Sequence, residues 1–149
     1  MNKKGDFFFM NNIEDSITYQ MHRIGILKNL QQVRINLNKT NTFLNVCIDC
    51  IQRIIIQDLI SIQQKEKFTN PKICKFQKDY SSTRNGYAHF FNSNKTIKNI
   101  SIKDLENIVQ EFHMAIQNKD SNNTQIFYED DGNITTILTE AFEKLYNNN

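Results

Sequence analysis

The chain has 149 residues, of which 39% are hydrophobic, and it carries a net charge of +2. This length supplies enough apolar material for one domain with a core and too little for two. A charge this close to zero excludes a broad basic surface, so any contact with a nucleic acid must be local. One Pro and four Gly leave few chain breakers, which favours long helices over a fold of many short strands.

The first predicted helix covers about 13 to 37, where apolar side chains recur at helical spacing. A polar break over 38–41 precedes a second predicted helix over 42–65, which carries another apolar stripe. Because the connection is short, the two helices should form an antiparallel hairpin. The second stripe consists of Phe43, Val46, Cys47, Ile51, Ile54, Ile55, Leu59 and Ile62.

Helix-start signals divide the rest of the chain. Asn70 and Pro71 predict the cap and first turn of a shorter third helix, which leads toward Arg84. Ser101 and Asp104 resemble a capping box ahead of a fourth helix that ends near residue 117. A polar linker follows, with a short extended segment over 125–128 and a turn over 130–132. The amphipathic segment 134–146 predicts a terminal helix.

These elements predict an all-α protein: an antiparallel four-helix bundle with an additional C-terminal helix. Residues 1–12 would be an N-terminal extension and 13–117 the bundle. Residues 118–149 would be a C-terminal segment whose helix packs on the bundle or on a dimer partner. The predicted core contains Ile24, Ile51, Ile54, Ile55, Leu105, Val109 and Phe112.

No apolar run approaches the length of a membrane span, and the run 7–9 is too short for the hydrophobic part of a secretion signal. We therefore expect a cytoplasmic protein without membrane contact. Cys47, Cys50 and Cys74 do not supply four zinc ligands, and core packing is the preferred interpretation of these thiols. His22 and His113 are expected at the surface or at the boundary of helices, without a role.

The segment Arg84-Asn85-Gly86-Tyr87-Ala88-His89 combines a fixed cation, a carboxamide, a glycine and a titratable imidazole. In one continuous helix the first and last of these residues would lie about 140° apart. A bend or a positive φ at Gly86 would bring them together, so we expect the segment at a helix end or in a short loop. Arg donates in a fork that matches phosphate oxygens, and His transfers protons near neutral pH. The pair suits phosphodiester chemistry.

The alternative interpretation is that the segment has only a structural role. Arg84 could cap helix carbonyls at an exposed corner, with His89 merely solvated. Tyr87 could stack on a base or pack against the bundle. The lysines on either side of the segment either gather around it as phosphate contacts or form a solvated helical face. They are Lys75 and Lys78 upstream, and Lys95 and Lys98 downstream.

The hexapeptide resembles the signature of HEPN domains, small all-helical proteins in which Arg is followed by four to six residues and then His, often with Asn directly after the Arg. The resemblance covers residues 13–117 and implies a bundle of the HEPN type. It also implies an endoribonuclease that needs no metal and no cofactor, and that leaves a 2′,3′-cyclic phosphate and a 5′-OH. His89 would then be the acid or base, and Arg84 would hold the scissile phosphate. Asn85 would orient the phosphate or the imidazole. Tyr87, Lys78 and Lys95 would contact the RNA.

The same resemblance implies partners. One His does not easily serve as base and acid in a single step, so a homodimer with both motifs facing one cleft is expected. The substrate would be tRNA or another single-stranded RNA, and the biological role that of a toxin or antiviral-defence effector with an antitoxin or regulatory protein. Phe91 replaces the Tyr that nucleotidyltransferase antitoxins modify, which argues against that type of control. A non-catalytic subunit that binds a nucleotide or partner, and an interaction protein that docks through 134–146, remain alternatives.

Overall fold

The computed structural model describes residues 13–37, 39–88, 99–117 and 132–146, and these residues form five helices and no strand. In chain order the helices are α1 (Ile13–Asn36), α2 (Thr42–Glu66), α3 (Pro71–Ala88), α4 (Ile102–Gln117) and α5 (Gly132–Tyr146). The prediction of an all-α chain is confirmed for this part of the sequence. The predicted extension 1–12, the extended segment 125–128 and most of the turn 130–132 lie outside the described residues.

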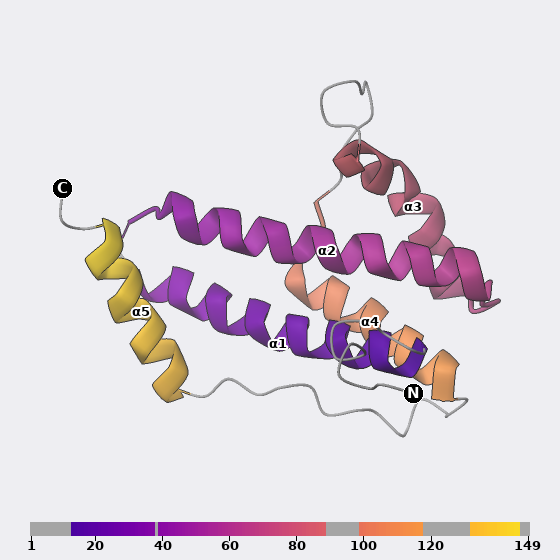
Figure 1. The fold of residues 1–149 in the computed structure, drawn as a ribbon, viewed down its shortest axis with the longest axis horizontal. Helices are drawn as coiled ribbons and strands as arrows, with labels where there is room; N and C mark the ends of the chain where they lie inside the picture. The colour runs from indigo at the N-terminus through magenta and orange to yellow at the C-terminus, as the bar shows by residue number, and fades with distance from the viewer. Residues whose placement is uncertain (1–12, 38, 89–98, 118–131, 147–149) are drawn as a thin grey trace, which may run out of the picture.

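α1 and α2 form the predicted antiparallel hairpin (Figure 1). Local caps set the ends of α2. The side-chain Oδ1 of Asn41 accepts a hydrogen bond from the N–H of Leu44 at 2.9 Å, which satisfies one of the unpaired donors of the first turn. Lys67 ends the helix in a left-handed conformation, with φ 55° and ψ 49°, and its N–H donates to the carbonyl of Gln63 at 2.8 Å.

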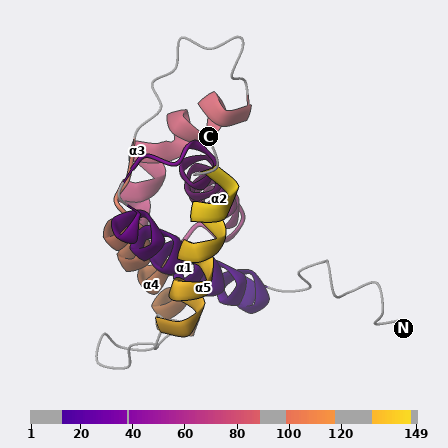
Figure 2. The same ribbon diagram turned by 90° about the vertical axis from the view of Figure 1, so that its left-hand side faces the viewer.

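α2 and α4 each pack against both α1 and α3, so that the four helices surround one core (Figures 1 and 2). Aromatic rings fill the end of this core where α3 begins. Phe112 of α4 meets Phe68 and Phe76 edge to face, with ring centroids 6.0 and 6.4 Å apart. The predicted core positions Ile24, Ile55, Leu105, Val109 and Phe112 are all buried.

The burial predicted for α2 is partly wrong, because this helix carries two apolar stripes. Ile51 is only partly buried, and 41% of Ile54 is exposed. The stripe that packs against the core runs through Leu44, Ile48, Ile55 and Leu59, whereas Phe43, Val46, Cys50 and Ile54 share the outward face. The core-facing residues and the outward-facing residues both recur at helical spacing. Periodicity alone therefore could not show which of the two stripes is buried.

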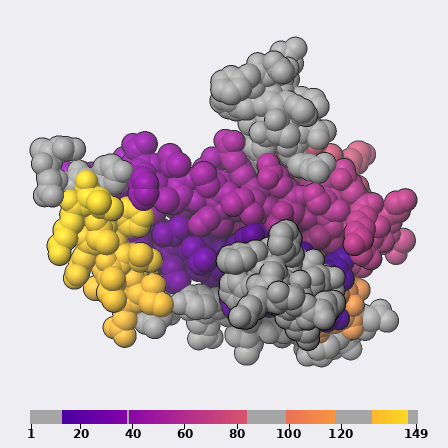
Figure 3. All heavy atoms as spheres, in the orientation of Figure 1, coloured from indigo at the N-terminus to yellow at the C-terminus, as the bar shows by residue number. Residues whose placement is uncertain are grey.

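α5 crosses the end of α1 and packs on that helix (Figures 1 and 2). Phe142 is its buried anchor, and its ring lies 5.9 Å from that of Phe43 on α2. The side-chain amide of Asn36 donates to the hydroxyl of Thr139 at 3.5 Å. In the space-filling view α5 forms one end of the molecule (Figure 3).

Candidate functional site

Five of the six residues of the predicted motif, Arg84 to Ala88, form the last helical residues of α3. The prediction of a helix end is therefore confirmed for these five positions. The predicted break at Gly86 is wrong, since the helix continues through it and no described glycine has a positive φ. His89 and Lys95 lie outside the described residues. Both ribbon views show the end of α3 standing apart from α1 (Figures 1 and 2).

The start of α3 is anchored by the predicted cap. Oδ1 of Asn70 accepts hydrogen bonds from the N–H groups of Lys72 at 2.8 Å and Ile73 at 3.3 Å. The amide of the same Asn70 donates to Glu111 of α4 at 3.1 Å, and Lys72 Nζ lies 3.0 Å from the other carboxylate oxygen. Glu111 thus joins the first turn of α3 to α4.

A buried glutamine fixes the turn before α3. Gln63 is 3% exposed, and its amide donates to the carbonyl of Phe68 at 2.9 Å while its Oε1 accepts from the N–H of Phe68 at 3.0 Å. The Sγ of Cys74 donates to the same carbonyl at 3.3 Å. Because both ends of this turn are held, the direction of α3 is set where the helix begins.

The middle of α3 packs through a stripe of residues that leads toward the motif. Ile73, Phe76 and Thr83 are buried, and Tyr80 stacks on Phe76 with ring centroids 5.1 Å apart. Burial raises the pKa of Tyr80, and the nearby carboxylates of Asp79 and Asp104 raise it further. Since Asp104 belongs to the first turn of α4, the middle of α3 lies close to the start of α4.

The opposite face of α3 is exposed and basic. Lys78 is exposed, and its position is seven residues before Asn85, so the two backbone positions share one helix face. Lys75, on the same face, forms an ion pair with Asp79 at 2.5 Å, and this hydrogen bond and the negative charge raise the pKa of Lys75. Of the predicted site residues, the structure therefore aligns Lys78 with Asn85.

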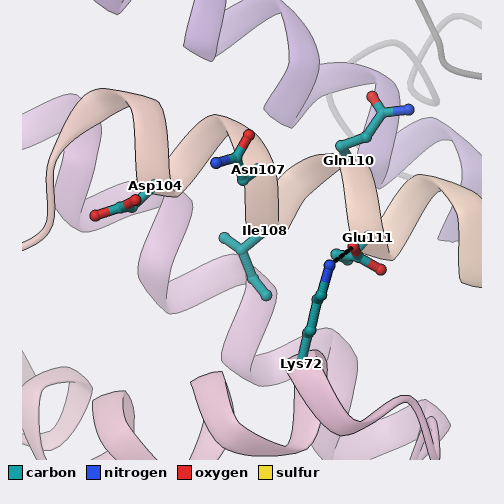
Figure 4. A pocket seen from close by; sticks show the side chains of 6 residues that line it. All are labelled: Lys72, Asp104, Asn107, Ile108, Gln110 and Glu111. Carbon is teal, nitrogen blue, oxygen red and sulfur yellow. Dashed lines mark hydrogen bonds and ion pairs between the residues drawn. The ribbon is translucent and has the colours of Figure 1, made fainter. Parts of the chain in front are cut away.

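A polar cavity of about 420 Å³ opens between the start of α3 and α4 (Figure 4). The Lys72–Glu111 ion pair spans it, while Gln110 points away from Lys72. Its lining contains one cation, Lys72, and two carboxylates, Asp104 and Glu111, so this surface does not attract an anion. None of its lining residues was predicted as a site residue.

Sequence reasoning also missed a polar link between α1 and α2. Gln20 is fully buried, and its amide donates to Asp58 Oδ2 at 2.9 Å. Arg23 donates to the same carboxylate oxygen at 2.5 Å and to Gln20 Oε1 at 3.0 Å. The signal was present, because Gln20 falls within the apolar stripe of Ile17, Met21 and Ile24. The cluster joins the two helices of the hairpin.

Two minor predictions need correction. Cys50 and Cys74 are exposed, and only Cys47 packs against the core. His113 is 6% exposed, because α4 is covered by both α1 and α3 and therefore buries a wide arc. His22 is exposed as predicted.

Among the described residues, no group of three or more His, Cys, Asp or Glu side chains is arranged to hold a metal ion. None of the five helices combines the length and apolar character of a membrane span within the described ranges. No family model, curated protein or solved structure matches this chain.

Proposed function

We propose that this protein is a metal-independent endoribonuclease of the HEPN type, with Arg84, Asn85 and His89 as its site. The observation that carries the proposal is the position of Arg84 and Asn85 in the last turns of α3, with His89 as the next residue after the helix. An arginine and an imidazole five positions apart in the sequence supply the anion-binding and proton-transfer groups that phosphodiester cleavage needs.

The arrangement of helices supports the same assignment. α1 to α4 surround one core and α5 lies outside them, which fits a four-helix bundle of the HEPN type with one additional C-terminal helix. The firmly held start of α3 and its packed stripe give the motif a rigid base, and rigid elements position reactive groups better than loops do. The exposed Lys78 continues the face of Asn85 and offers a phosphate contact.

In the proposed reaction, an imidazole removes the proton of the ribose 2′-OH, and the 2′-oxygen attacks the adjacent phosphorus. The bond from phosphorus to the 5′-oxygen breaks, and a second imidazole gives that oxygen its proton. Arg84 stabilises the negative charge that develops on the phosphoryl oxygens. The products are a 2′,3′-cyclic phosphate and a 5′-OH, and no metal or cofactor takes part.

Each chain supplies one motif imidazole, so two of them in one cleft come from two copies of the chain. We therefore propose a twofold homodimer in which the two α3 ends face each other. Light scattering should give the mass of a dimer, and cleavage per chain should fall when dilution separates the subunits. A strictly monomeric protein that cleaves RNA would contradict the shared site.

The assay for the function itself uses purified protein, total RNA and tRNA, in the presence of EDTA. We expect cleavage that leaves cyclic phosphate ends. Arg84→Ala should abolish most of it, and Arg84→Lys should remain impaired because an ammonium cannot make the forked contact. Arg34→Ala is the matched control, since Arg34 is an exposed arginine in the last turn of α1. RNA that stays intact, or equal losses in the Arg84 and Arg34 variants, would refute the proposal.

A second candidate is a non-catalytic subunit that binds a protein partner. The outward face of α5 favours it, because Ile137 and Leu145 are 63% and 65% exposed. Exposed apolar side chains on one helix are typical of a docking surface. This candidate predicts intact RNA in the same assay. It also predicts a partner or second subunit that the double variant Ile137→Lys, Leu145→Lys releases, as measured by native mass spectrometry.

A further inference from the structure

A cavity of about 330 Å³ lies between α1 and α5. Its described walls are His22, Ile26 and Asn29 of α1 and Ile134 and Leu138 of α5. The residues from each helix are three or four positions apart and therefore share one face. Its volume is at the lower end of the range of small-molecule pockets.

Asn29 is the buried polar group in this cavity. Only 4% of its surface is exposed, and its side-chain oxygen Oδ1 has no hydrogen-bond partner among the described residues. A buried acceptor without a donor destabilises a folded chain, because the hydrogen bonds it would make in the unfolded state are not replaced. The site therefore favours a ligand that brings a donor.

The other residues that line the cavity determine the polarity of the rest of the ligand. Ile26, Ile134 and Leu138 are aliphatic, so most of a bound molecule must be apolar. His22, Ile26 and Ile134 are exposed, so the cavity is open to solvent on one side. A cavity of about 150 Å³ lined by Leu, Ile and Phe binds benzene, and a space about twice as large suits two fused rings.

We propose that the cavity between α1 and α5 binds a small, mainly apolar molecule whose single hydrogen-bond donor is directed at Oδ1 of Asn29. The site is built from α1 and α5, whereas the proposed ribonuclease residues belong to α3 and the residue after it. The two proposals therefore succeed or fail separately. The ligand would also bridge two helices, and so hold α5 against the bundle.

Indole and indene are the probes, because they have nearly the same shape and only indole carries an N–H donor. The chain contains no Trp, so indole fluorescence can be followed without interference from tryptophan. Indene binding is then measured by displacement of indole. Full-length protein should bind indole about tenfold more tightly than indene, as one additional hydrogen bond of ordinary net strength gives.

Variants locate the binding. Asn29→Leu should remove the preference for indole and retain indene binding. Leu138→Phe, which fills the cavity, should abolish binding of both probes, and Ile26→Phe tests the same blockade from α1. Ile137→Phe is the control, since Ile137 is the exposed neighbour of Leu138 and does not line the cavity. The proposal would be overturned if neither indole nor indene binds. It would also be overturned by a preference for indole that survives Asn29→Leu, or by binding that neither filling variant changes.

Discussion

α4 and α5 are both amphipathic, yet only α4 is a core helix. α4 lies between α1 and α3 and buries five apolar side chains, whereas α5 packs on α1 and buries Phe142. Ile137 and Leu145 remain exposed on α5. An apolar stripe in a sequence thus shows that a helix packs against another element. How much of the stripe is buried depends on how many helices pack against it. The stability of the fold should depend on α4 much more than on α5.

The largest expected effect is that of Phe112→Ala in α4. Phe112 is fully buried and contacts the rings of Phe68 and Phe76. Removing the ring leaves a cavity where α4 meets the start of α3, and we expect a loss of about 3–5 kcal/mol in the free energy of unfolding. Urea denaturation followed by circular dichroism measures it. A loss below about 1 kcal/mol would show that α4 is not the core helix described here.

Phe142→Ala makes the corresponding change in α5, and its effect should be smaller and local. The residue anchors one helix to α1 and to Phe43, so its loss should release α5 before the rest of the molecule unfolds. We expect faster hydrogen exchange in 132–146 and unchanged exchange in α4, at a cost of about 1.5–3 kcal/mol. If hydrogen exchange became equally faster in α4 and α5, the claim that α5 is released before the rest of the molecule would be wrong.

Ser101→Ala tests how far α4 depends on its cap. The hydroxyl of Ser101 accepts a hydrogen bond from the N–H of Asp104 at 3.0 Å, and losing such a cap typically costs about 1 kcal/mol. Ser82→Ala is a control at an exposed serine within α3. Equal melting temperatures for the two variants would mean that tertiary packing alone sets the start of α4.

The smallest effect should come from Ile137→Ala on the exposed face of α5. With 63% of the side chain in solvent, we expect the free energy of unfolding to change by no more than about 0.5 kcal/mol. The measurement is again urea denaturation, repeated at several protein concentrations. A larger loss that grows with protein concentration would instead place this face in a subunit interface.

Local signals in the sequence were sufficient to find the helices. Asn41, Asn70 and Ser101 act through hydrogen bonds to residues two or three positions away, so the helix starts they mark were predictable. Burial was less predictable, because it depends on distant elements. Ile54 and Ile55 are neighbours of the same residue type, and the packing of α1 and α3 on α2 decides that Ile55 is buried and Ile54 exposed.

The same distinction applies to the candidate site. The position of Arg84 and Asn85 at a helix end followed from the residue types nearby, although the expected break at Gly86 did not occur. The link from Gln20 to Asp58 joins two helices 38 positions apart, and the cavity beside Asn29 forms only where α5 packs on α1. No local spacing encodes such contacts, and these were the features that sequence reasoning missed.

The most direct test of the proposed function is the rate of RNA cleavage by His89→Ala beside the unaltered protein, both in EDTA. General acid–base catalysis contributes roughly 10²–10⁴ in rate, so the variant should be slower by about a hundredfold or more. Its melting temperature should be unchanged, which separates lost chemistry from lost folding. Full activity in His89→Ala, or activity in the unaltered protein that EDTA removes, would contradict the mechanism.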